Sequence, residues 1–226
     1  MKVTLVAMTK PVGTGNAEDV VERSAAVCYD SKPTATHRIA AACARSGHMS
    51  VWEHISFTFH VEEVSRALLA QLSRHRHISL SVRSQRYNSE KAFDYMMPKT
   101  VEDNASARYE YIWIMNRIEE SYDVLQADHI PNEDARAVLP NACYTELYLT
   151  VNARALVEIS RLRLCTRAQA EIRELFQMIK EVLKGFSPMV AGMMVPKCEQ
   201  VEGMPFCTEG KGCGRHPMLK DVYKGE

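Results

Sequence analysis

The sequence carries no net charge and has no long apolar run. Its 28 Lys and Arg residues balance 28 Asp and Glu residues, and its isoelectric point is about 7.1, so no overall field would hold nucleic acid or an anionic membrane surface. Apolar stretches such as 67–70 are too short to cross a bilayer, and the first residues lack the apolar core of a signal peptide. We therefore expect a soluble, cytoplasmic protein in which a local cluster of cations meets any anionic ligand.

Several ligand-binding patterns are also missing. No Gly-x-Gly-x-x-Gly loop opens a helix, which leaves a Rossmann mode of dinucleotide binding unsupported, and no aromatic platform suggests an RNA-binding domain. The seven cysteines form an odd set without regular spacing, which favours reduced thiols in a reducing compartment. Cys28, Cys43 and Cys143 fall in segments with helical periodicity, and we expect them to be packing residues.

The cysteines near the C-terminus allow more than one interpretation. Cys198, Cys207 and Cys213 could bind a structural zinc together with Cys165 or His216, could form a disulfide, or could remain free thiols. Their spacing lacks the Cys-x-x-Cys pair that is typical of zinc sites. The sequence leaves these alternatives open, and we assign no metal ligand from it.

The composition is that of a globular protein. Of 226 residues, 46% are hydrophobic and 25% are charged, which allows one domain with a sizeable core. No internal repeat or linker divides the chain. We expect a catalytic domain over residues 1–185 and a Cys-, Gly- and Pro-rich tail over residues 186–226 that packs on the same domain.

Hydrophobic periodicity predicts an α+β fold with few strands and many helices. Alternating apolar residues predict a short strand over 3–7 and a longer strand over 51–61, and the polar segment up to residue 91 is expected to be an ordered loop. Helical spacing predicts the following helices: one that Asn16 caps, one over 33–47, one that Ser65 caps, and others over 109–127, 141–164 and 166–184.

Two groups of arginines stand out. Residues 71–91 carry several Arg, His and Ser residues but a single acid, Glu90. Guanidinium groups beside hydroxyls suit a phosphorylated ligand, although a solvated cationic helix end is an equally simple interpretation of composition alone. In the second group, Arg154, Glu158 and Arg161 are separated by three and four residues, a spacing that predicts ion pairs within one helix.

The motifs in these groups resemble those of a known family. Arg-His-Arg at 74–76, followed after seven residues by Ser-Gln-Arg-Tyr at 84–87, is similar to the signature of the flavin-dependent thymidylate synthases. Other blocks match that family in order and spacing: 47–54, 135–140, 152–154, 162–163 and 168–173. The resemblance covers roughly residues 40–180.

The resemblance implies a fold and an activity. The implied fold is a single domain in which a mostly antiparallel sheet is flanked by long helices. The implied enzyme is a methyltransferase that converts dUMP to dTMP, with methylenetetrahydrofolate as carbon donor, FAD as hydride carrier and NADPH as reductant. Its sites would be shared between the subunits of a homotetramer.

The resemblance also implies site residues. Arg163 is the catalytic residue, since a guanidinium can stabilise negative charge on the uracil ring without losing a proton. The residues implied for dUMP are Gln71, Arg74, Ser84, Gln85, Arg86, Arg136 and Arg163. The residues implied for FAD are Ser50, Arg74, His75, Arg76, Asn152, Arg154 and Glu158. At Val82 and Glu158 the chain departs from the residues that many family members carry.

Physical arguments refine two of these roles. His75 stands between two arginines in sequence, so we expect like charge to keep its ring neutral and its role to be positioning. Ser84 has no recognisable base beside it in sequence, so we expect it to bind substrate and not to act as a nucleophile. A non-catalytic homologue that only binds nucleotide or flavin remains the alternative function.

Overall fold

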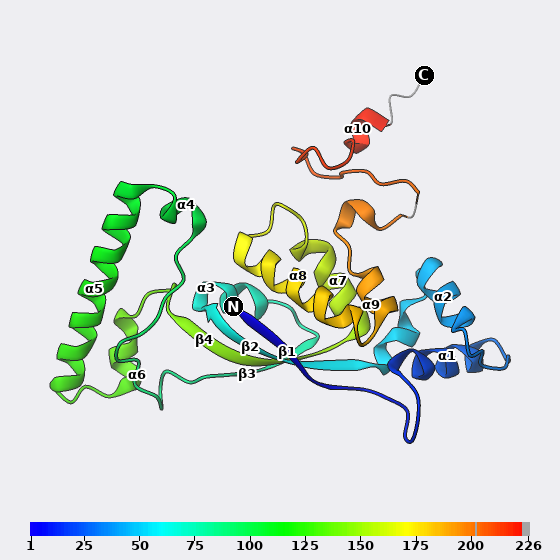
Figure 1. The fold of residues 1–226 in the computed structure, drawn as a ribbon, viewed down its shortest axis with the longest axis horizontal. Coiled ribbons are helices and arrows are strands. Elements are labelled where there is room, and N and C mark those ends of the chain that lie inside the picture. The colour runs from blue at the N-terminus through cyan, green and yellow to red at the C-terminus, as the bar shows by residue number, and fades with distance from the viewer. Residues whose placement is uncertain (202, 223–226) are drawn as a thin grey trace. The chain divides into compact units, whose positions relative to one another are not determined.

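The computed structural model describes residues 1–201 and 203–222 and contains one four-stranded antiparallel sheet (Figure 1). The strands are β1 (Lys2–Met8), β2 (Ser56–Ser65), β3 (Ile78–Val82) and β4 (Tyr144–Asn152), and their order in the sheet is β1-β2-β4-β3. The expected α+β class, an antiparallel sheet with long helices, is confirmed.

Helices make up most of the remaining regular structure. The α-helices are α1 (Ala17–Cys28), α2 (Arg38–Arg45), α3 (Arg66–Leu72), α4 (Lys99–Glu102), α5 (Ala105–Ala127), α6 (Asn132–Ala135), α7 (Ala153–Arg163), α8 (Ala170–Lys184), α9 (Pro188–Met193) and α10 (Leu219–Val222). The 3-10 helices are η1 (Met49–His54), η2 (Arg136–Val138) and η3 (Lys197–Glu199). Within the described part of the chain, none of the helices has both the length and the apolar character that a membrane span requires.

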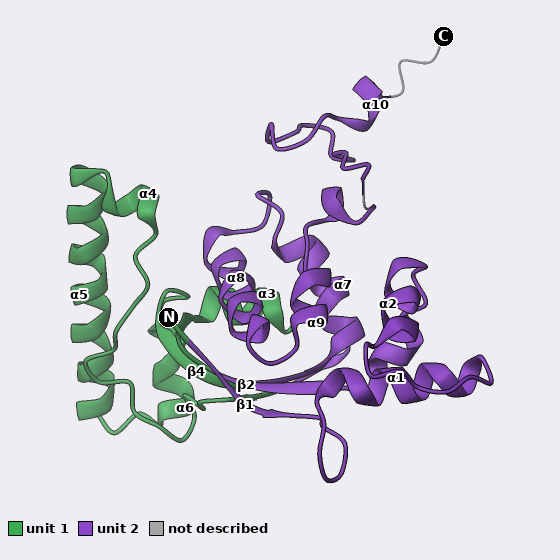
Figure 2. Cartoon of the chain, turned by 45° about the vertical axis from the view of Figure 1, so that its right-hand side comes forward, with its two compact units in different colours: residues 1–2, 61–74, 80–148 green, residues 3–60, 75–79, 149–226 purple. Residues whose placement is uncertain are grey.

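The chain divides into two compact units, shown in different colours in Figure 2. Unit 1 comprises residues 1–2, 61–74 and 80–148, and unit 2 comprises residues 3–60, 75–79 and the described residues of 149–226.

Unit 2 has a core built on strand segments, including part of β2, and on the helices that pack against them. Phe57 and Phe59 of β2 are fully buried because alternate side chains of a strand point to the same face. Helix α7 contacts η1, α8 and α9, and the buried side chains there include Trp52, Leu156 and Phe176. The apolar stripes of α7 and α8 therefore form this core.

Unit 1 is organised by the long helix α5. This helix contacts α4, α6 and η2, and Met115 on it packs with Phe93 and Cys143 in a separate apolar cluster. The backbone N–H of Glu90 donates to the hydroxyl of Tyr122, which is fully buried on α5. This bond satisfies a polar group that burial would otherwise leave without a partner.

The predicted helix over 141–164 is wrong in its first half. Residues 144–152 form β4, and only the part from Ala153 onward is helical. Leu147 and Val151 fit a helical spacing of four, but they fit strand alternation equally, and Leu149 between them is buried on the same face. The segment forms a strand because β4 is hydrogen-bonded to β2 on one side and to β3 on the other.

Other predicted boundaries also shift. The predicted strand over 51–61 is wrong in its first residues, which form η1, and the strand continues to Ser65. The predicted loop before residue 91 contains the short strand β3. The predicted helix over 33–47 begins only at Arg38, and the predicted helix over 166–184 begins only at Ala170.

The predicted N-caps of two helices, α1 and α3, are confirmed. The Asn16 side chain accepts from the backbone N–H of Asp19, whose carboxylate accepts from the Asn16 backbone in return, so α1 starts with a capping box. Ser65 caps α3 by accepting from Leu68 N at 3.0 Å. Both helices begin where a polar oxygen replaces the missing backbone acceptor.

The packing prediction for three cysteines is only partly confirmed. Cys43 and Cys143 are buried, but Cys28 is exposed. Cys143 lies just before β4 and pairs with Tyr95 in an isolated bridge, not in a helix. Burial raises the pKa of its thiol to about 11, so it stays protonated at neutral pH.

Candidate functional site

Helix α7 places two arginines at opposite ends. Its N-cap is Asn152, the last residue of β4, whose Oδ1 accepts from the backbone N–H of Ala155 at 2.8 Å. Arg154 therefore lies in the first turn and Arg163 in the last. The predicted helix over 141–164 would place both Asn152 and Arg154 in its middle, which is wrong, since the helix starts at this cap.

Arg163 and His75 form a hydrogen bond within unit 2. The Nε of Arg163 donates to Nε2 of His75 at 3.0 Å. A guanidinium can only donate, so the imidazole must accept at Nε2, and a ring that accepts there is neutral with its proton on Nδ1. Burial, and then the charge of Arg163, lower the pKa of His75. The expected neutral ring is confirmed, although its causes are burial and Arg163, not the arginines next to it in sequence.

Arg154 is held by two carboxylates. Its Nε lies 2.9 Å from Glu158 Oε1, and its Nη1 lies 2.6 Å from Glu53 Oε1. The hydrogen bonds to Glu158 and Glu53 raise the pKa of Arg154. The predicted intrahelical ion pair with Glu158 is confirmed. Glu53 was not identified from the sequence, because no local spacing relates residues that are 101 positions apart.

Two adjoining hollows border these residues. One, of about 230 Å³, is lined by Glu53, His77, Asn152, Arg154, Ala155 and Glu158. The other, of about 210 Å³, is lined by His75, Arg76, His77, Ala155, Glu158, Ile159 and Leu162. The two share His77, Ala155 and Glu158. Of the residues expected to bind FAD, those of unit 2 line these hollows except Ser50, which is exposed on η1.

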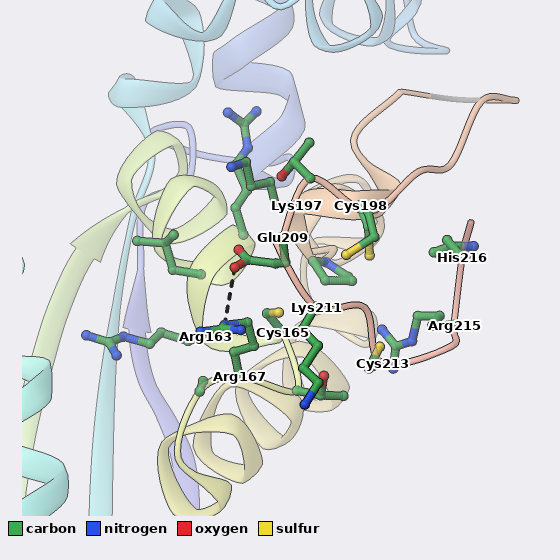
Figure 3. Close-up of a pocket in the computed structure, with 17 residues that line it drawn as sticks. Arg163, Cys165, Arg167, Lys197, Cys198, Glu209, Lys211, Cys213, Arg215 and His216 are labelled. Atoms are coloured by element: carbon green, nitrogen blue, oxygen red, sulfur yellow. Dashed lines mark ion pairs between the residues drawn. The ribbon is translucent and has the colours of Figure 1, made fainter. Parts of the chain in front are cut away.

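A third cavity of unit 2 lies at the other end of α7 (Figure 3). Its volume is about 300 Å³, and its walls come from residues 161–168 and from the tail over 196–216. Arg163 lines it, and Arg167 forms an ion pair with Glu209 at 3.2 Å. Sequence reasoning did not find this cavity, because the tail lies outside the family resemblance.

In unit 1, two arginines of the dUMP set meet at one acid. Arg86 places Nε 3.0 Å and Nη2 2.9 Å from Glu133 Oε2. Arg136 donates from Nε to the backbone carbonyl of the same residue at 3.1 Å. Glu133 precedes η2 and was not identified from the sequence. Glu133 thus joins its own helix to a segment 47 residues earlier, and its carboxylate offsets part of the positive charge of Arg86.

The remaining dUMP residues of unit 1 lie after β3, on α3 and just beyond α3. Ser84 Oγ accepts from the backbone N–H of Arg86 at 3.2 Å, so its first role is to shape this loop. Gln85 lies 3.8 Å from the Cys143 thiol, and Gln71 is on α3. Arg74 is exposed just beyond α3. The dUMP set thus lies in unit 1 apart from Arg163, and the FAD set lies in unit 2 apart from Arg74.

Comparison with known proteins decides the family. The family described as thymidylate synthase complementing protein (Thy1) matches residues 5–189. The chain belongs to the flavin-dependent thymidylate synthase family. A protein of that name from Nitratidesulfovibrio vulgaris is 39% identical over 192 residues, which cover 80% of this chain and 77% of the relative. One from Clostridium tetani is 35% identical over 237 residues and covers 93% of this chain and 94% of its own length.

A further relative agrees with these. The flavin-dependent thymidylate synthase of Geobacter sulfurreducens is 39% identical over 180 residues, which cover 79% of this chain and 76% of the relative. The family resemblance inferred from the motifs is therefore confirmed. The family match includes helix α7 with Arg163, and the tail that lines the third cavity lies beyond its last residue.

Proposed function

We propose that this protein is a flavin-dependent thymidylate synthase that methylates dUMP to dTMP. In this proposal methylenetetrahydrofolate is the carbon donor, and NADPH supplies the reducing equivalents through FAD. The observation that carries the proposal is the similarity to relatives with that name, one of which is covered over 94% of its length. The family match extends over residues 5–189 and includes the Arg-His-Arg and Ser-Gln-Arg-Tyr segments.

The proposed phosphate site is the arginine pair of unit 1. Arg86 pairs with the Glu133 carboxylate and Arg136 donates to the backbone carbonyl of the same residue, so both side chains lie close to one position that a phosphate could take. A phosphate dianion offers more charge and more acceptor oxygens than one carboxylate. In the proposed reaction dUMP takes the place of Glu133 as the partner of these arginines, and Ser84 and Gln85 contribute neutral donors.

The proposed activating residue is Arg163. Carbon C5 of uracil becomes a better nucleophile when negative charge can develop at N3 and the carbonyl oxygens. A guanidinium that is already oriented stabilises this charge without a proton transfer. The bond from Arg163 to His75 orients the side chain, and because His75 accepts as a neutral ring, this bond does not itself offset the positive charge of the guanidinium.

The residues around the two adjoining hollows have the donor chemistry that a flavin dinucleotide needs. Arg76 and Arg154 suit a pyrophosphate, and Asn152 caps the helix through Oδ1 only, so its amide N–H groups suit a ring or ribose oxygen. When bound, FAD would supply the hydride that completes the methyl group. Glu158 lies within this set, and its ion pair with Arg154 offsets the repulsion that a carboxylate would exert on a phosphate.

The size of these hollows supports shared sites. Neither hollow approaches the several hundred cubic ångströms that a cofactor pocket commonly encloses. A second subunit would supply the missing walls, so we propose the homotetramer with sites formed between subunits.

The decisive experiment combines a spectrum with an assay. The purified protein is expected to show the visible absorption of bound flavin and to release tritium from C5-labelled dUMP only when NADPH and methylenetetrahydrofolate are both present. A yellow protein without tritium release would support the non-catalytic alternative. A colourless protein that neither binds added FAD nor releases tritium would exclude both.

A further inference from the structure

The tail of unit 2 has defined backbone structure without a core. Among the described residues of 197–222 none is buried, yet Cys207 and Met218 form an isolated bridge. The bridge consists of two backbone hydrogen bonds of 2.8 Å that Cys207 makes with Pro217 and Leu219. A segment this small gains too little free energy from apolar burial to hold such a conformation. Small protein segments without a core are commonly stabilised by a disulfide or a metal ion.

Metal-ligating side chains gather at this place. Suitable ligand atoms of Cys198, Glu199 and His216 all lie within 4.8 Å of one another, and His216 Nε2 is 3.1 Å from Glu199 Oε1. Ligands bound to one zinc ion at 2.0–2.3 Å lie about 3.3–3.8 Å apart, so only small side-chain rotations are needed. Figure 3 shows Cys198 and His216 on the tail segments beside the cavity.

The backbone brings a further cysteine, Cys207, close to these three residues. Phe206 N donates to the carbonyl of Cys198 at 3.1 Å, which holds the next residue, Cys207, beside Cys198. The bonds of Cys207 to Pro217 and Leu219 hold it beside the segment that follows His216. Sequence positions 198, 207 and 216 are thus joined although none has Cys-x-x-Cys spacing.

We propose that Cys198, Glu199, Cys207 and His216 bind one structural Zn²⁺ ion. Two thiolates with an imidazole favour zinc over magnesium or calcium, which prefer oxygen ligands. Binding displaces the two thiol protons to solvent, with no change of oxidation state. Arg215 pairs with Glu199 through Oε1, so Oε2 can bind the ion while Arg215 remains in place.

The site would fix one wall of the third cavity. Lys197, Lys211 and Arg215 line that cavity together with Arg163, and all three belong to the tail that the ion would hold. The inference does not rest on the proposed function, since a metal content can be measured whether or not the protein turns over dUMP.

The test is the zinc content of the full-length protein. Protein purified under reducing conditions without chelator is expected to contain about one zinc per chain, since structural sites of this type hold the ion tightly at neutral pH. Cys198→Ser and Cys207→Ser should each lower that content by roughly tenfold or more, because a lost ligand weakens the site. Cys213→Ser is the matched control: Cys213 lies in the same tail but outside the cluster of Cys198, Glu199 and His216, and this variant should keep its zinc.

A second measurement does not depend on variants that fold. Cobalt exchanged into the wild-type protein should give thiolate charge-transfer bands and visible bands at wavelengths longer than flavin absorption, and chelation should speed proteolysis within 197–222. Wild-type protein with less than about a tenth of a zinc per chain would overturn the proposal, whether Cys198 and Cys207 then prove to be free thiols or a disulfide. Equal zinc loss in Cys213→Ser would overturn the ligand assignment.

Discussion

Arg163 of unit 2 and Arg86 of unit 1 are held in opposite ways. In unit 2 Arg163 donates to a neutral imidazole, whereas in unit 1 Arg86 donates to the carboxylate of Glu133. The first bond sets the direction of the side chain without pairing it with an anion, whereas the second pairs the guanidinium with an anion that we propose the substrate phosphate replaces. We infer that a guanidinium that acts on a substrate ring is best oriented by an uncharged hydrogen-bond acceptor. Guanidinium groups that bind a phosphate can instead be kept in position by a carboxylate that the phosphate displaces.

Removing Arg163 is expected to have the largest effect. Arg163→Ala should lower kcat by about 10²–10³-fold, because a preoriented donor to developing charge contributes most in the transition state. The melting temperature should change little, since Arg163 lies in the last turn of α7 and outside its buried face. Steady-state tritium release and thermal unfolding measure the two.

Arg163→Lys sharpens the interpretation of that result. Lysine keeps the charge but loses the planar fork, so its kcat should fall between wild type and Arg163→Ala. If Arg163→Ala turned over near the wild-type rate, the catalytic role assigned to Arg163 would be wrong.

The unit 1 arginines should instead affect substrate binding. Arg86→Ala should raise KM for dUMP by roughly 10- to 100-fold with kcat within a few-fold, because a hydrogen bond to a charged group contributes about 1.5–3 kcal/mol. The exposed ion pair with Glu133 contributes at most about 1 kcal/mol to folding, so this variant should remain folded.

Glu133→Gln tests the exchange directly. It keeps the size of the side chain but removes the competing negative charge, so KM for dUMP should fall a few-fold where Arg86→Ala raises it. A rise in KM in both variants would mean that Glu133 positions the arginines and is not displaced by substrate.

Asn152 separates a structural role from a ligand role at one position. Asn152→Ala should lower the free energy of unfolding by about 1 kcal/mol, because it removes the N-cap of α7. Asn152→Ser keeps a capping oxygen but lacks the amide N–H groups, so it should restore stability and still lose bound flavin. Thermal unfolding and the visible spectrum report these separately, and equal destabilisation of both variants would contradict the capping role.

Features of the fold that depend on contacts between residues close in sequence could be predicted from the sequence, and features that depend on distant residues could not. The caps at Asn16 and Ser65 were predictable because each involves a hydrogen bond to a residue three positions on. The helix–strand boundary at Asn152 was not, because Leu147 and Val151 satisfy both periods and only sheet pairing decides between them.

The candidate site followed the same division. Family motifs identified Arg163 and Arg86 by number, but not the partners that set their chemistry. Glu133 reaches Arg86 across 47 positions, and His75 reaches Arg163 across 88. Such contacts depend on tertiary packing, and no local pattern in one sequence encodes them.

The smallest predicted effect concerns pH. In the folded protein burial, and then Arg163, lower the pKa of His75, whereas in the unfolded chain the ring titrates near its ordinary value of about 6.5. As pH falls through 6.5 the unfolded chain takes up this proton before the folded one does, so stability from this group is present above that pH and declines below it. Protonation would also give the ring a second N–H donor facing a guanidinium, which breaks their hydrogen bond.

Two variants separate the causes of that pH dependence. His75→Gln keeps an acceptor for Arg163 and cannot titrate, so its melting temperature should fall less than that of wild type between pH 7.5 and pH 5.5. Arg163→Met removes the smaller cause, like charge, and leaves burial, so its slope should lie between the two. If the melting temperature of wild type falls no more with pH than that of His75→Gln, the ring is protonated equally in the folded and unfolded states. The assignment of a neutral His75 as the partner of Arg163 would then be wrong.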